Sequence, residues 1–203
     1  MSRIIVDAVR NSSASADGIT LASDGSVTLP GNATCSGTAT GFGGGKLLQV
    51  VQTVKTDHFS ASNVNGSDIT GMNVAITPAS SSSKVLILCE LAVGDAGNGY
   101  AGFILRRGST NIGNSTALDG QNAANTQDTA FGFGSESSQA TYKLNNTSFQ
   151  FLDSPSTTSA TTYKLQLVTW TSGTFHLNRP NSIGNARYTM AGTSTITAME
   201  IAA

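Results

Sequence analysis

Charge is what this sequence has least of. Charged residues make up 11% of its 203 residues, against roughly 25% in an average soluble domain, and the formal net charge is −1. The surface must therefore be built from neutral polar groups. The Lys and Arg positions form no run that would attract a phosphate backbone, so we exclude nucleic acid as a partner.

Long apolar runs are also missing. The run from Val85 to Leu88 is among the longest, whereas a bilayer-spanning helix needs about 20 apolar residues. The opening Met-Ser-Arg-Ile-Ile-Val-Asp reaches Asp7 after a short apolar stretch and lacks the apolar region of a secretory signal. We expect no membrane insertion, no signal peptide, and synthesis in a cytoplasm.

Cysteine and histidine are too scarce for most metal or disulfide chemistry. The two cysteines, Cys35 and Cys89, cannot form the disulfide framework of a small secreted domain, and both are expected to be buried thiols. Of the two histidines, His58 adjoins Asp57, but no further ligand has the spacing of a zinc site, and His176 lies in a predicted strand. We predict no metal site and no cofactor.

Catalytic motifs are equally sparse. No Gly-x-Ser-x-Gly elbow is present, and the loop carboxylates of Asp119, Asp128, Glu136 and Asp153 have no spacing that selects a catalytic pair. Asp95, Asp119 and Asp128 could gather around calcium, but no calcium-loop pattern accompanies them. We expect the chain not to be an enzyme, with a hydrolase as a minor alternative.

Serine and threonine are abundant, at about a quarter of the chain, and with 22 glycines they favour strands and turns over helices. In the first 45 residues, apolar alternation on both sides of Asp24-Gly25 predicts two short strands around a tight turn. A lone hairpin is marginally stable, so we expect three copies to wind around one axis. That arrangement would bury Ile4, Val6, Ile19, Leu21, Val27 and Leu29; a flexible arm is the alternative.

A glycine cluster, from Gly41 to Gly45, marks a change of composition. We place a domain boundary there, with an extended N-terminal segment over residues 1–45 and a second domain over residues 46–203. The cluster precedes a strand-like segment and opens no helix, so it does not predict a nucleotide site.

From Lys46 onward, alternating strands follow one another between polar turns. In the clearest strand, Val85 to Val93, every second side chain is apolar, while Leu86 and Leu88 point to the opposite face. Eight or so short strands without helical periodicity predict an all-β fold, a β-sandwich or jelly roll. The other expected strands lie in 47–54, 72–77, 103–107, 131–133, 149–151, 163–167, 175–177 and 195–201.

Two polar loops, Thr110–Asp128 and Asn178–Arg187, are expected to be exposed and suited to recognition. Aromatic side chains beside hydrogen-bonding loops are the usual binding groups for carbohydrate or protein. An alternative places Trp170 and Tyr188 at a subunit boundary. The candidate binding residues are Tyr100, Asn111, Asn114, Asp119, Asn122, Trp170 and Tyr188.

Four stretches of this sequence resemble structural proteins of bacteriophages. They are the opening Met-Ser-Arg-Ile, residues 21–37, residues 48–53 and the closing residues 192–201. The resemblance is to tail-fibre-type proteins of marine and freshwater phages, including cyanophages, and covers a minor part of the chain. It implies a homotrimer whose residues 1–45 contact other virion proteins and whose C-terminal β-sandwich faces the host; it carries no catalytic residues.

The expected function is therefore that of a virion structural protein made in the host cytoplasm. The first hypothesis is a short tail fibre or fibre tip that attaches to a host surface glycan or protein. The alternative is a capsid decoration protein that cements the shell, which the short length of the chain favours. A polysaccharide depolymerase is the third and least favoured hypothesis.

Overall fold

The described residues of the chain form strands, turns and loops. The computed structural model divides the chain into two compact units, Met1–Gly44 and Gly45–Ala203. No described residue lies in a helix, which confirms the all-β prediction. The structure describes residues 6–10, 12–13, 15–16, 18–29, 47–62, 64–94, 100–115, 129–134, 142–170, 174–185, 187 and 189–203.

The first unit contains a three-stranded antiparallel sheet, in the order β1-β2-β3. Its strands are β1 (Ala8–Val9), β2 (Ile19–Leu21) and β3 (Val27–Thr28). The turn between β2 and β3 is closed by a hydrogen bond of 2.8 Å from the Ser26 amide to Asp24 Oδ1, and Gly25 has a φ of 84°. The hairpin predicted around Asp24-Gly25 is confirmed. Two residues are too few for alternation to have predicted β1.

Apolar side chains of this first unit are exposed. None of its described residues is buried, and Val9 and Val27 are 52% and 58% exposed. Because these side chains have no core of their own, burial against a partner would stabilise the unit. The trimeric winding and the anchoring role of residues 1–45 stay predictions, and Ile4 lies outside the described residues.

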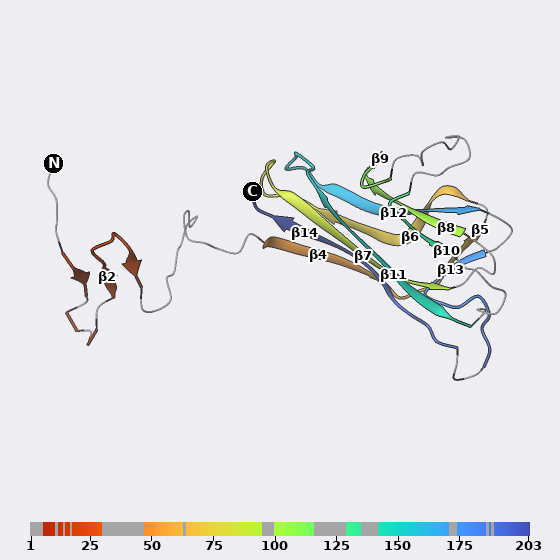
Figure 1. Cartoon of the computed structure of the whole chain (residues 1–203), viewed down its shortest axis with the longest axis horizontal. Coiled ribbons are helices and arrows are strands. Elements are labelled where there is room, and N and C mark those ends of the chain that lie inside the picture. The colour runs from red at the N-terminus through yellow and green to blue at the C-terminus, as the bar shows by residue number, and fades with distance from the viewer. Residues whose placement is uncertain are drawn as a thin grey trace. The chain divides into compact units, whose positions relative to one another are not determined.

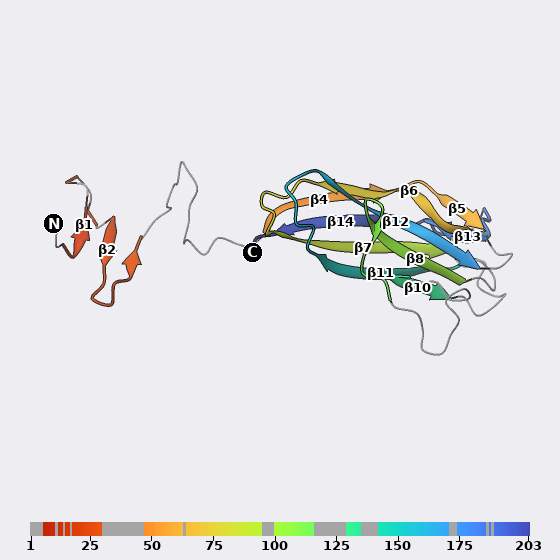
Figure 2. The ribbon, with the colours of Figure 1, turned by 90° about the horizontal axis from the view of Figure 1, so that it is seen from above.

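The second unit is a sandwich of two antiparallel sheets (Figures 1 and 2). The five-stranded sheet has the order β10-β8-β12-β6, with β9 paired to β8. Its strands are β10 (Phe131–Gly134), β8 (Tyr100–Arg107), β12 (Thr161–Trp170), β6 (Asn65–Ile76) and β9 (Thr110–Asn111).

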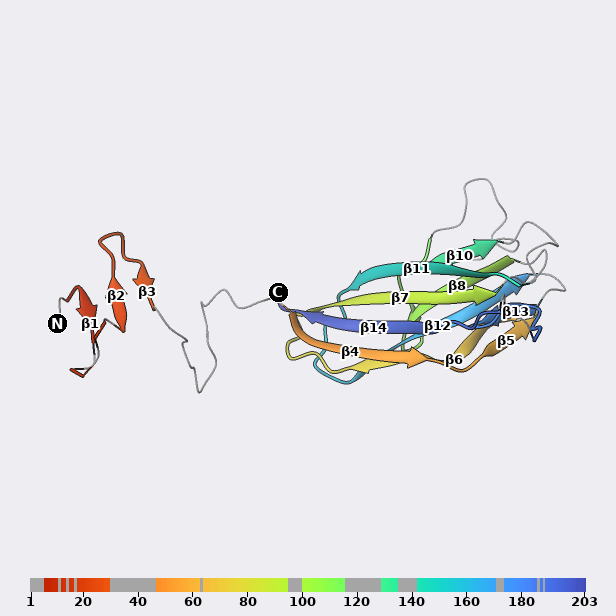
Figure 3. The same cartoon turned by 90° about the horizontal axis from the view of Figure 1, so that it is seen from below.

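The six-stranded sheet places β4, β14, β7 and β11 side by side, as Figure 3 shows. Two short strands, β5 and β13, pair with each other, and β13 also pairs with β7 at Val93 and Gly94. The bounds are β4 (Leu47–Lys55), β14 (Ser194–Ile201), β7 (Lys84–Gly94), β11 (Leu144–Asp153), β5 (Phe59–Ser62) and β13 (Thr174–Leu177).

The core lies between the two sheets and contains the side chains that alternation predicted. Cys89 is a free, buried thiol whose pKa is raised to about 12 by burial, as the sequence predicted; Cys35 lies outside the described residues. Phe131 stacks on Phe103 and on Phe149, with ring centroids 4.7 and 5.1 Å apart. These rings join strands of both sheets, so they stabilise the sandwich itself.

One predicted loop boundary was wrong. Thr110 and Asn111 were expected in an exposed loop, but they form β9, which pairs with Arg106 and Arg107 of β8. The hairpin turns at Gly108, whose φ of 57° suits glycine. The two residues of β9 are polar and pair only with the edge of β8, so they show no apolar alternation that would predict a strand.

Residues 178–193 connect β13 to β14, two strands that lie along the same edge of β7, and we call this connection the excursion. Since β11 pairs with β7 along Val85–Gly94, β13 and β14 must share the opposite edge of β7. Asn178 closes the base of the excursion and has a positive φ of 65°, which asparagine tolerates better than most residues. Its Nδ2 donates to the Lys55 carbonyl at 2.8 Å, and its Oδ1 accepts from Ser194 Oγ at 2.6 Å.

Candidate interaction surface

The candidate binding residues from the sequence are only partly described. Tyr100 begins β8 and Trp170 ends β12, and the two are cross-strand partners, so the backbone brings them together. Asn111 is exposed on β9, and Asn114 is half-buried just beyond it. Asp119, Asn122 and Tyr188 lie outside the described residues, as do the side chains of Tyr100 and Trp170. Their role in binding stays a prediction.

The outer face of the five-stranded sheet is polar. Lys164 on β12 pairs with Asp68 on β6 at 2.8 Å, and Gln166 Nε2 donates to the other carboxylate oxygen at 2.6 Å. The hydrogen bonds from Lys164 and then Gln166 lower the pKa of Asp68. On this polar surface, Asp68 is already paired with Lys164 within the chain.

The outer face of the six-stranded sheet is different, and we call it the apolar face. Its side chains alternate with core side chains along β4, β14, β7 and β11. Val50 and Leu152 are 51% and 46% exposed although both are aliphatic. The face comprises Leu48, Val50, Gln52, Val54, Lys84, Leu86, Leu88, Glu90, Ser148, Gln150, Leu152, Thr195, Thr197, Met199 and Ile201.

Strand register gives the apolar face its internal order. Leu152 is the cross-strand partner of Leu86, Leu86 of Met199, and Met199 of Val50. Directly opposite side chains on one face of an antiparallel pair lie within contact distance. One continuous apolar row therefore crosses all four strands.

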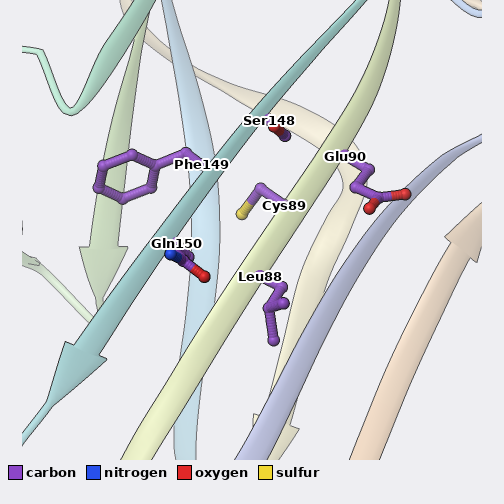
Figure 4. Close-up of a pocket in the computed structure, with 6 residues that line it drawn as sticks. All are labelled: Leu88, Cys89, Glu90, Ser148, Phe149 and Gln150. Atoms are coloured by element: carbon purple, nitrogen blue, oxygen red, sulfur yellow. The ribbon is translucent and has the colours of Figure 1, made fainter.

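Two hollows lie on this face. The first, of ≈ 380 Å³, lies between β7 and β11, where Leu88 and Glu90 stand beside Ser148 and Gln150 (Figure 4). The second, of ≈ 330 Å³, lies over β7, β14 and β4 and shares Leu88 and Glu90 with the first. Neither hollow contains a cluster of titratable groups, so their chemistry suits packing against another surface.

Only two outward positions of the apolar face carry charge, and they are Lys84 and Glu90 on β7. Both side chains are exposed, and neither forms an ion pair with another described residue. Lys84 begins β7, and Glu90 lies six residues further along the same face of that strand. The apolar face is therefore electrically neutral but polarised along β7.

One hydrogen-bonded chain of side chains was not predicted. His176 Nδ1 lies 2.8 Å from Ser60 Oγ, and its Nε2 lies 3.0 Å from Asn181 Oδ1. The order of hydroxyl, imidazole and orienting amide matches that of an activated nucleophile. Because 116 residues separate Ser60 from His176, no local motif could have indicated the contact.

His176 lies in β13, in a strand as the sequence predicted, and its imidazole is buried. It is 6% exposed because the start of the 178–193 excursion covers it. Burial lowers its pKa, and the charge of Arg179 lowers it further, although the hydrogen bond to Asn181 acts in the opposite direction. The imidazole is thus held neutral beside an exposed serine.

Asp153, one of the carboxylates considered for a hydrolase, has a structural environment. It accepts two contacts from Arg107 Nη1, at 2.9 and 2.8 Å, and one from the Tyr163 hydroxyl at 2.7 Å. Burial and the neighbouring carboxylate raise the pKa of Tyr163. The cluster ties β11 of one sheet to β8 and β12 of the other. The other three loop carboxylates lie outside the described residues.

No family model matches this chain, and no curated protein matches it. Solved structures of the Gt and Gx strains of infectious bursal disease virus are similar over 76% of this chain, at 18% identity, with TM-scores of 0.39 and 0.38. The chain spans 38% and 37% of the length of those viral chains. A likeness at this level carries no argument about fold or function.

The described residues include no group of three or more His, Cys, Asp or Glu side chains that could hold a metal ion. Nor do they form a helix long and apolar enough to cross a membrane. The apolar face is therefore the strongest candidate site that the structure offers.

Proposed function

We propose that this chain is a virion structural protein that works by packing and binding and performs no chemistry of its own. The observation that carries the proposal is the apolar face, in which aliphatic side chains such as Val50 and Leu152 are about half exposed. An apolar patch of this kind on a soluble domain marks an interaction site. The outer face of the five-stranded sheet is polar, so the same chain does place polar side chains on an outer sheet face. The apolar face therefore does not result from a general shortage of polar residues.

Two further features support assembly. The first unit has exposed apolar side chains and no buried residue among those described, as expected of a segment that is stabilised by partners. The resemblance of the N-terminal stretches to phage tail-fibre-type proteins gives that partner a class, other virion proteins. We propose that residues 1–45 hold the chain on the particle as part of a homotrimer.

The more specific proposal is a short tail fibre or fibre tip that attaches to a host surface glycan or protein. In this role the sandwich presents its loops, with Tyr100 and Trp170 as cross-strand neighbours beside them. A capsid decoration protein is the alternative, because the apolar face would suit attachment to a shell equally well.

The test is the position and copy number of the chain in purified particles, by cryo-electron microscopy together with mass spectrometry of the same sample. Density in a small multiple of three copies at the tail would support attachment. Density spread over the capsid lattice would replace it with the decoration role. If purified particles contain no copy of the chain, the virion proposal is wrong in both forms.

A hydrolase is the one enzymatic candidate with an observation in its favour, the Ser60–His176–Asn181 chain. Isolated host envelope polysaccharides and ester substrates would be incubated with the protein and with its Ser60→Ala variant. Product release that the substitution abolishes would assign the serine as a nucleophile. We expect no release from either protein, since the imidazole is buried under the excursion.

A further inference from the structure

We propose that the apolar face is an isologous interface, on which a second copy of this chain packs sheet against sheet. In this arrangement, β7 of the second copy runs antiparallel to β7 of the first. The inference rests on the proposed function, because it names the partner of the same face. Three observations carry it: the apolar row across four strands, the position of the two charges, and the neutrality of everything else on the face.

The charges are what distinguish a second copy from an arbitrary apolar partner. Lys84 and Glu90 are six residues apart on β7 and point to the same side. A two-fold axis that crosses β7 at Ile87 brings Lys84 of each copy opposite Glu90 of the other. The face is then complementary to itself, which is the defining property of an isologous interface.

The same operation matches the apolar groups. Leu86 of one copy meets Leu88 of the other on β7, while on the flanking strands the apolar row of each copy lies over Gln150, Thr197 and Gln52 of its partner, so the apolar contact is centred on β7. Face-to-face sheets pack about 10 Å apart with strands within about 30° of one another, so interdigitation of these side chains is sterically ordinary. The two hollows beside Leu88 provide space for the partner's aliphatic side chains.

A three-fold axis along the strands would not suit this face. All three copies of β7 would then run in the same direction, so that Glu90 would approach Glu90 and Lys84 would approach Lys84. Like charges at a desolvated contact oppose association. If the chain is also a trimer, the three-fold contacts must therefore involve other surfaces, such as the first unit.

The footprint sets the expected strength. Four strands about 4.8 Å apart, over about seven residues at 3.3 Å each, give a flat area of roughly 450 Å² on each copy. Specific interfaces bury about 800 Å² per partner, so this contact belongs to the small and reversible class. We expect it to be measurable at micromolar protein concentration.

The experiment uses the full chain and two single charge reversals, Glu90→Lys and Lys84→Glu. Each reversal turns two opposite-charge contacts into two like-charge contacts and should weaken the pairing roughly 30-fold. In sedimentation velocity between about 1 and 100 µM, the rise of mass with concentration should therefore be displaced roughly 30-fold to higher concentration for either variant. Mixing the two variants restores both charge contacts and should restore the wild-type mass, as should the double reversal in one chain.

Controls on the other sheet make the result specific. Asn73→Glu on β6 and Thr162→Lys on β12 add charge to exposed positions of the polar face, and should leave the mass unchanged. A fold check by circular dichroism accompanies each variant. Neither reversal breaks an ion pair with another described residue, and both side chains are exposed.

Two outcomes would overturn the inference. One is a wild-type mass that neither reversal changes; the other is a wild-type chain that is a monomer or a plain trimer over the whole concentration range. Because the masses are measured on purified protein, they do not depend on whether the chain is found in particles. A chain that pairs in solution but is missing from virions would remove the proposed function and keep the interface.

Discussion

Asn178 offers the sharpest test of how the excursion over residues 178–193 is attached to the sandwich, because its side chain bonds to both neighbouring segments. Its side chain is buried, with no exposed surface, and makes three hydrogen bonds: to the carbonyls of Lys55 and Asp57, at 2.8 and 2.9 Å, and from Ser194 Oγ at 2.6 Å. The substitution Asn178→Ala removes all three. Each is worth about 1 kcal/mol net, so their loss costs about 3 kcal/mol.

The backbone adds a second contribution. At a φ of 65°, alanine is strained by about 1 kcal/mol relative to a residue that tolerates the left-handed region. Asn178→Ala should therefore lower the free energy of unfolding by about 4 kcal/mol, a large part of the 5–15 kcal/mol typical of a domain. Asn178→Gly relieves the strain and should cost about 1 kcal/mol less than Asn178→Ala.

The measurement is urea unfolding followed by far-ultraviolet circular dichroism, at one protein concentration because association contributes to apparent stability. Asn111→Ala is the matched control, since that side chain is exposed, and it should change stability by less than about 0.5 kcal/mol. A loss below about 1 kcal/mol for Asn178→Ala, or a larger loss for the glycine variant, would refute this account of the excursion.

Three further substitutions test other parts of the sandwich. Asp153→Ala leaves the buried Tyr163 hydroxyl without its acceptor and should cost about 3 kcal/mol by calorimetry; a change within about 0.5 kcal/mol would show that the cluster is not structural. The lowered pKa of His176 means that the unfolded chain binds its proton more tightly, so stability should fall as the pH drops below 6.5, by at most about 1.4 kcal/mol per pH unit. His176→Gln should lack this slope, and an unchanged slope would assign it to another group. Gly94→Ala places a Cβ 2.0 Å from the Arg179 carbonyl oxygen and should cost more than about 2 kcal/mol in urea unfolding, whereas a neutral result would mean that the backbone there yields easily.

Alternation predicted the long strands because each has one face in a dry core. Along β7, the positions from Val85 to Val93 that the sequence assigned to one face are buried. Alternation failed for β9 and for the first half of β6, where Gly66 and Gly71 have positive φ and the pairing with β12 is irregular. In such stretches pairing is set by the neighbouring strand, which no local pattern encodes.

The apolar face shows the same limit at the level of the site. The sequence indicated that Leu86 and Leu88 point away from the core, but a single strand does not define a surface. The face exists because β11, β7, β14 and β4 are neighbours, and their order brings together residues such as Val50 and Met199. Strand order is a long-range property that the local sequence does not encode. The binding residues predicted from the sequence therefore lie in loops and at aromatic side chains.

The excursion over residues 178–193 has a consequence for how the protein can change over time. Its two ends are joined by the hydrogen bond between Ser194 and Asn178, so the sheet on either side is complete whatever lies between them. Lengthening a loop whose ends already meet costs little, about 0.6 kcal/mol for each doubling. Natural variation or a grafted peptide epitope could therefore enter here without disturbing strand register, on a scaffold that stays the same.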